Sequence, residues 1–176
     1  ITTSLLLSLA FAGPAAAQGE TAGTNSFLPE LPSASELTRE DIGHHFKISS
    51  DENDAAGEER VFFVGVSTAG RAIAFSSTDT PEYRRTYAET MNYCSLRGEK
   101  WRMPTLDELR MLTPHANAPD DDYLPGSYWT TTHAPCHDCP HPEMFMMAYD
   151  VRTGNVRNNY ASPIFKNYPL CTYDIP

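Results

Sequence analysis

Four cysteines constrain the fold of this chain more than any other feature: Cys94, Cys136, Cys139 and Cys171. In an exported chain of this size, cysteines form disulfides more often than they remain free thiols. Four cysteines allow three pairings. Cys136 and Cys139 are so close in sequence that a local pair is the simplest expectation, which leaves Cys94 to pair with Cys171. The second bond would close most of the domain into one loop and stabilise it by roughly 4 kcal/mol.

The amino-terminal stretch indicates export. Residues 1–13 are rich in leucine, carry no charge and lead into the small residues of positions 14–18 (PAAAQ), a pattern that signal peptidase cleaves. This run is too short to span a bilayer. Because the basic start of a signal peptide is missing, we expect residues 1–17 to be a signal-peptide remnant. No later stretch approaches membrane-spanning length, so we expect a secreted protein in the periplasm, at the cell surface or outside the cell.

The charge of the chain argues against several classes of partner. There are 13 Lys and Arg residues against 23 Asp and Glu residues, which gives a net charge of −10. A nucleic-acid binder needs a basic stripe to neutralise phosphates, and none is visible. Adhesion to anionic lipid or sulfated sugar is also disfavoured over most of the surface, although a local basic patch could override this.

The composition divides the chain after the export signal into a linker and one domain. Residues 18–40 are rich in Gly, Ser, Thr, Pro and Glu, which is typical of a flexible linker. Residues 41–176 have the size of one domain. Within it we expect a short strand at 44–48, a hairpin over 61–75, a second hairpin from 144–151 and 155–160, and a last strand at 170–173.

Two helices are expected between the hairpins. Thr80 as cap, Pro81 in the first turn and Gly98 as stop predict a helix over 81–97. Its expected core face carries Tyr83, Tyr87, Met91 and Cys94. Residues 105–108 (TLDE) form a capping box that predicts a second, shorter helix. Hairpins, helices and long loops in this order indicate an α+β fold and not the βαβ repetition of a parallel sheet.

The segment 101–109 (WRMPTLDEL) resembles the Trp-Arg-Leu-Pro-Thr-x-x-Glu-Leu signature of the Lcl C-terminal-like family, a branch of the C-type-lectin-like fold. Residues 127–132 (SYWTTT) and the hairpin around 148–156 are similar to further family segments, with Cys171 as the closing cysteine. The resemblance implies a compact domain of small antiparallel sheets with a helix-to-C-terminus disulfide. Members are mostly exported or surface proteins, and some are adhesins that bind glycans or host polymers. Fold alone does not fix function, and the calcium-site motifs of lectins are absent from this sequence.

The signature residues have structural interpretations. We expect Trp101 and Trp129 to be core residues rather than ligand contacts. For Arg102, a buried pair with Glu108 or Asp107 and a functional role stay equally open.

Residues 133–141 combine three histidines and two cysteines in nine positions. Imidazole and thiolate are preferred ligands of zinc and copper. The candidate ligands of this alternative are His133, Cys136, His137, Cys139 and His141. We favour instead a small disulfide loop with solvent-facing histidines and no cofactor, because thiols outside the cytoplasm tend to oxidise.

These observations favour a non-catalytic binding module over an enzyme. No Ser-His-Asp order or Gly-x-Ser-x-Gly elbow is present, although oxidases occur on the broader fold. The expected partner is a glycan or a protein at the cell envelope or surface, and the chain could also be an assembly subunit. We expect the contacts on the long loops of residues 113–143 and on the aromatic-rich stretch 158–168. Candidate contact residues are Tyr128, Tyr160, Phe165 and Tyr168, whose rings offer anchoring area; ordinary loop packing is the alternative for them.

Overall fold

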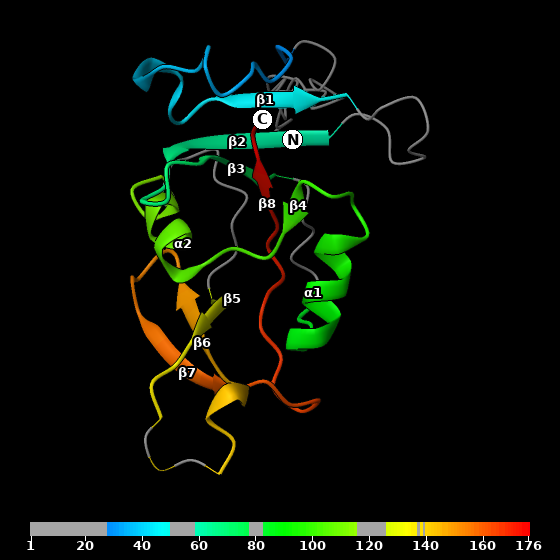
Figure 1. The fold of residues 1–176 in the computed structure, drawn as a ribbon, viewed down its shortest axis with the longest axis vertical. Helices are drawn as coiled ribbons and strands as arrows, with labels where there is room; N and C mark the ends of the chain where they lie inside the picture. The colour runs from blue at the N-terminus through cyan, green and yellow to red at the C-terminus, as the bar shows by residue number, and fades with distance from the viewer. Residues whose placement is uncertain (1–27, 50–58, 78–82, 116–125, 137, 139) are drawn as a thin grey trace, which may run out of the picture.

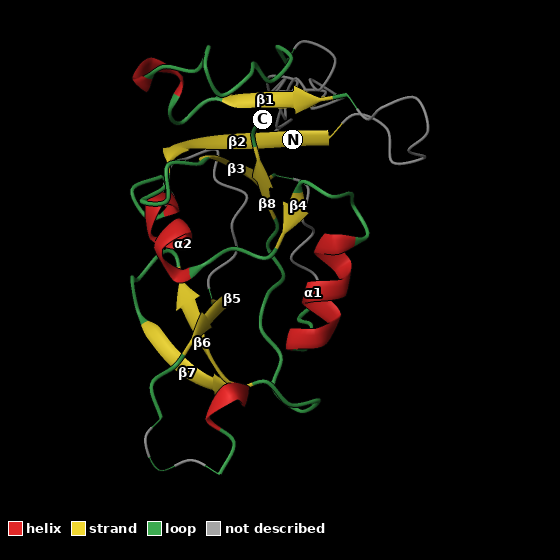
Figure 2. Ribbon diagram, in the orientation of Figure 1, coloured by secondary structure: helices red, strands yellow, loops and turns green. Residues whose placement is uncertain are grey.

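The computed structural model describes residues 28–49, 59–77, 83–115, 126–136, 138 and 140–176. It is an α+β fold with two α-helices and two antiparallel sheets. In Figure 1 the larger sheet lies above the smaller one, and the helices lie on either side between them. The same arrangement is coloured by secondary structure in Figure 2. The expected α+β class is confirmed.

The larger sheet has five strands in the order β1-β2-β3-β8-β4. Their bounds are β1 (His45–Ile48), β2 (Glu59–Val66), β3 (Ala72–Ser76), β4 (Trp101–Arg102) and β8 (Thr172–Asp174). β2 and β3 form the expected hairpin, whose turn places Gly70 at a φ of +76° that favours glycine. The carboxyl-terminal strand β8 lies between β3 and β4, so the end of the chain is built into the sheet.

Both faces of this sheet are buried, because apolar residues occupy consecutive positions of β2. Val61 and Phe63 face one hydrophobic cluster, and Phe62 and Val64 face another. Successive side chains of a strand point to opposite faces. A single run of apolar residues therefore supplies two cores.

The smaller sheet has the order β5-β6-β7. β5 (Ser127–His133) pairs with β6 (Phe145–Asp150), which pairs with β7 (Val156–Tyr160). The β6–β7 turn contains Gly154 at a φ of +73°. The Asp150 carboxylate accepts hydrogen bonds from the backbone of Arg152 and Thr153 there. This is the second hairpin that the sequence predicts.

The first helix is shorter than expected. α1 (Tyr87–Ser95) begins after Thr86, whose side chain and Glu89 form a capping box. The expected start at Thr80 is wrong because Arg85 is extended and exchanges backbone hydrogen bonds with Asn167. The expected core face is also corrected: Cys94 is buried, but Tyr83 is 70% and Met91 48% exposed.

The second helix agrees with its sequence signal. α2 (Leu106–Leu112) is capped by Thr105 and Glu108, each bonded to the other's backbone N–H. Leu106, Leu109 and Leu112 are buried in a hydrophobic cluster to which strands of both sheets contribute side chains. The helix begins where the capping box places it.

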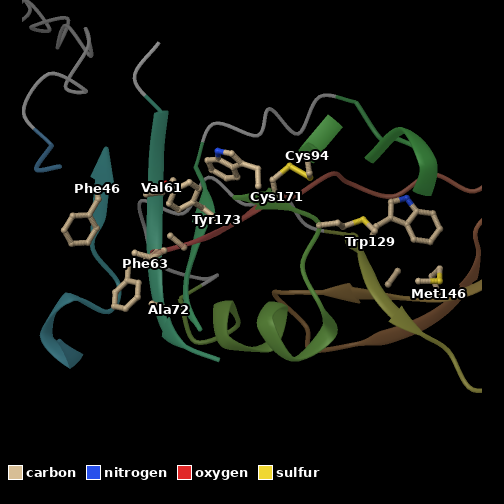
Figure 3. Close-up of a cluster of buried hydrophobic side chains, with 14 residues drawn as sticks. Phe46, Val61, Phe63, Ala72, Cys94, Trp129, Met146, Cys171 and Tyr173 are labelled. Carbon is tan, nitrogen blue, oxygen red and sulfur yellow. A yellow bond between two sulfur atoms is a disulfide. The ribbon is translucent and has the colours of Figure 1, made fainter. Parts of the chain in front are cut away.

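The disulfide between Cys94 and Cys171 is confirmed, with an S–S distance of 2.07 Å. Both residues are fully buried, and the bond joins α1 to the residue before β8. Figure 3 shows it inside the hydrophobic cluster, between Tyr173 on one side and Trp129 on the other. Cys136 is also disulfide-bonded; its expected partner Cys139 lies outside the described residues.

Residues 28–40 correct part of the expected flexible linker. Leu31 donates a backbone hydrogen bond to Lys47 in β1, and Ala34 donates one to Pro176. Leu31, Ala34 and Leu37 pack against the hydrophobic core. The ordered domain therefore starts before residue 41, because scattered apolar residues suffice to bind this segment to β1. Residues 1–27, including the expected signal peptide, lie outside the described part.

None of the helices in the described ranges has the length and apolar composition that crossing a bilayer requires. A disulfide forms in oxidising compartments. The Cys94–Cys171 bond is thus compatible with an extracellular or periplasmic location.

Candidate functional site

The residues of the segment 101–109 have structural roles. Trp101 is 6% exposed and Trp129 is fully buried, as expected. The Trp129 indole donates to the Arg85 carbonyl at 2.8 Å. Neither tryptophan is therefore available as a ligand contact on the surface.

Arg102 forms the centre of an ion-pair network. Its Nη1 and Nη2 donate to the two Glu108 oxygens at 2.8 and 2.7 Å, and Nη2 and Nε donate to Asp174 at 2.6 and 2.9 Å. Arg71 lies 3.4 Å from Glu108 and 3.5 Å from Asp174. The open question about Arg102 is thus answered by a pair with Glu108, which joins β4, α2 and β8.

This network keeps buried Glu108 ionised. Burial raises the pKa of Glu108, but hydrogen bonds from Arg102 and from the Thr105 backbone outweigh it, so the pKa lies below its ordinary value. Burial likewise lowers the pKa of Arg102, and its bonds to Glu108 and Asp174 outweigh that effect and raise it. Two cations thus meet two carboxylates, and the network is a stabilising cross-link.

The four expected contact residues differ in exposure. Tyr128 is 3% exposed and belongs to the core, so its expected role as a surface contact is corrected. Tyr160 is half-buried, packs against the Phe145 ring in a tilted arrangement and donates its hydroxyl to the Met144 sulfur. Of the four, Phe165 is the most available, with 46% exposure.

Tyr168 connects this region to a second segment of the chain. Its ring lies between Tyr128, at a centroid distance of 5.7 Å, and the Arg84 guanidinium, at 4.9 Å. The backbone of Arg85 donates to Asn167 at 2.8 Å and accepts from it at 3.0 Å. Residues 83–85 and 164–168 therefore lie side by side, although they are far apart in sequence.

We call the exposed residues around this bridge the loop face: Tyr83, Arg84, Ile164, Phe165 and Lys166. Tyr83 is 70% and Ile164 81% exposed. Arg84 and Lys166 are exposed and make no ion pair within the described part of the chain. The loop face thus combines apolar area with two unpaired cations, on a chain whose net charge is −10.

The bridge also contains two unsatisfied donors. Arg85 Nε and Asn167 Nδ2 are buried and have no hydrogen-bond partner within the described ranges. Side chains of directly paired residues lie on the same side of an antiparallel pair. A buried donor without an acceptor costs about 1–3 kcal/mol. Within the described ranges the bridge therefore lacks two side-chain hydrogen bonds.

The His/Cys-rich segment is only partly described. His133 ends β5 and is exposed, and His141 lies 3.4 Å from the Glu143 carboxylate with both side chains in solvent. Cys136 is in a disulfide and offers no thiolate. His137 and Cys139 lie outside the described residues. Among the described residues, no group of three or more His, Cys, Asp and Glu is placed to hold a metal ion.

No protein-family model matches the sequence, and no curated protein matches it.

Tyr83 and Arg84 were not among the residues expected at a site, whereas Ile164 and Lys166 lie within the expected contact stretch 158–168 but were not singled out. Tyr83 was assigned to the core because the helix was expected to start six residues too early. The Thr86–Glu89 capping box was the signal that could have corrected this, since it has the same spacing as the box at Thr105 and Glu108.

Proposed function

We propose that this protein is an exported, non-catalytic binding module with a C-type-lectin-like fold, related to the Lcl C-terminal-like family. It recognises an anionic glycan or protein partner through the loop face. The observation that carries the proposal is the grouping of exposed Ile164 and Phe165 with the unpaired cations Arg84 and Lys166. Apolar anchors beside positive charge suit a partner that presents carboxylate or sulfate groups next to an apolar surface.

The framework behind the loop face supports this role. The bridge between Arg85 and Asn167 and the indole hydrogen bond of Trp129 hold the two segments on the core. The Cys94–Cys171 bond lies in the same cluster as Trp129. A surface fixed in this way loses little conformational entropy when a partner binds.

The proposal is tested by saturable binding of the purified protein to two sets of immobilised ligands. One set holds uronate-containing and sulfated polysaccharides with neutral ones as reference, and the other holds acidic and neutral peptides. We expect binding to the anionic members of one set. Phe165→Ala should weaken it about tenfold, and Lys166→Ala should weaken it and reduce its dependence on salt.

Two control variants separate the loop face from general effects. Val66→Ala removes an apolar side chain that is 61% exposed on β2. Arg110→Ala removes a cation on α2 that pairs with Asp107. Both should bind like the unmodified protein. Equal losses in controls and loop-face variants, or no saturable binding to either set, would refute the proposal.

A further inference from the structure

The outer edge of β7 has open backbone groups. β7 is the last strand of the smaller sheet, and its partner β6 pairs Val156 with Tyr149 and Tyr160 with Phe145. The bonds from Asp150 N to Asn155 O and from Ala161 N to Met144 O fix the alternation of this ladder. In an antiparallel pair, every second residue directs its backbone N–H and C=O toward the partner strand, and the residues between them direct theirs away from it.

It follows that the backbone groups of Val156, Asn158 and Tyr160 point away from β6. The Tyr160 carbonyl accepts from Ser162 at 2.8 Å, and within the described ranges the other outward groups of these residues have no partner. Val156 is 39% exposed, and Asn158 is exposed. A free edge of this kind is a template for another strand.

The outer edges of β1 and β5 differ from that of β7, because each is paired with another segment of the chain. Residue Glu30 forms a bridge to Lys47 on β1, and Tyr168 forms one to Tyr128 on β5. A segment of the chain thus covers each of these edges. The fourth edge strand, β4, has only two residues, and its Trp101 N–H donates to Gly98. The edge of β7 is therefore the one that offers a longer run of outward backbone groups among the described strands.

We propose that this strand is β7 of a second copy of the chain, antiparallel, with Asn158 opposite Asn158. Several registers allow the outward backbone groups of the two strands to bond to each other. This register is the one in which all five residues of each strand have a partner. It places Val156 opposite Tyr160 and Arg157 opposite Asn159 of the second copy. Pairs of an aromatic with a β-branched residue are favourable across strands. Moving the register by two residues toward Val156 would place Arg157 opposite Arg157, and like charges at that position are destabilising.

The pairing joins two smaller sheets into one continuous sheet across a twofold axis. Because residues 161–168 follow β7 directly, each copy contributes its loop face at one end of the paired strands, which are roughly 15 Å long. Two loop faces on one particle would raise avidity for a repeating partner. The dimer itself goes beyond the proposed function and does not depend on it. A five-residue strand pair buries little area, so we expect a weak, concentration-dependent dimer.

Charge exchange at Asn158 tests the pairing. Asn158→Glu places two carboxylates opposite each other, and Asn158→Lys places two ammonium groups there. Sedimentation velocity over a concentration series should show a dimer for the unmodified protein and monomers for each variant alone. An equimolar mixture of the two variants should recover the dimer, because Glu then faces Lys. This recovery also shows that both variants are folded.

Asn92→Glu is the matched control, since Asn92 is exposed on α1 and the same charge is added away from β7. It should dimerise like the unmodified protein. A monomer at all concentrations overturns the proposal. So does a dimer that both Asn158 variants still form separately, or a variant mixture that stays monomeric although each variant unfolds cooperatively.

Discussion

Replacing Glu108 by glutamine should destabilise the domain far more than the size of the change suggests. Glu108 is 2% exposed, and each of its oxygens accepts from Arg102. One oxygen also accepts from the Thr105 backbone and the other lies 3.4 Å from Arg71. An amide turns one acceptor into a donor, which then faces the donors of a guanidinium.

The expected loss of unfolding free energy follows from the hydrogen bonds that the glutamine amide group cannot accept. A hydrogen bond to a charged group contributes about 1.5–3 kcal/mol. Removing one partner of a buried ion pair costs about 3–5 kcal/mol. Because Arg102 keeps its bonds to Asp174, we expect a value near the lower end, about 3 kcal/mol. Urea unfolding followed by tryptophan fluorescence measures it, since both tryptophans are buried.

Asp107→Asn is the matched control for Glu108→Gln. It makes the same chemical change one position earlier, where Asp107 pairs with Arg110 at 3.0 Å and both side chains are more than half exposed. Exposed pairs contribute at most about 1 kcal/mol. If Glu108→Gln costs no more than Asp107→Asn, the network does not stabilise the fold as argued.

The pH dependence of stability gives a second readout of the same change. Burial raises the pKa of Glu108, but its bonds to Arg102 and Thr105 outweigh this, so the folded-state pKa lies below the ordinary value of a glutamate. A carboxylate with a depressed pKa stabilises the fold above its unfolded-state pKa and loses that contribution as pH falls through the folded-state pKa. The free energy of unfolding should therefore fall on acidification below about pH 4.5. Glu108→Gln should flatten this fall, and an unchanged acid slope would count against the assignment.

For two further changes, the structure lets us estimate the loss of unfolding free energy. The double variant Cys94→Ala/Cys171→Ala opens a loop of 77 residues, which should cost about 4.5 kcal/mol of unfolding free energy; a loss below about 1 kcal/mol in denaturant titrations would contradict the estimate. Gly126→Ala would place a Cβ 2.6 Å from the Tyr168 ring, so we expect a loss of about 1–3 kcal/mol by overpacking. Gly70→Ala is its control, with positive φ but nothing within 4 Å of the added Cβ; equal losses in the two variants would remove the steric argument.

Features encoded locally could be predicted from the sequence. The capping box at Thr105 and Glu108 starts α2 because both partners lie within one turn. The β2–β3 and β6–β7 hairpins have glycine turns between β-rich segments. The Cys94–Cys171 pair was also predicted, because four cysteines leave few choices.

Features that depend on distant segments could not be predicted in the same way. The bridge between Arg85 and Asn167 is such a feature, since no local pattern reports that pair, although the Thr86–Glu89 capping box marks locally where α1 begins. Tyr128 was expected to be a contact residue because its ring offers anchoring area, yet it packs in the core against Tyr168. The loop face is likewise created by two segments that meet only after folding.

The Cys94–Cys171 bond also determines what happens when the backbone is cut. Every residue from α2 to β7 lies between the two bonded cysteines. A protease that cuts once within this range cannot release a fragment, because both pieces stay joined through sulfur. Such a nicked molecule would migrate as one species on a non-reducing gel and as two after reduction, and its hydrophobic cluster could remain assembled. Tolerance of single cleavages is therefore a property that the position of this one bond gives to the domain.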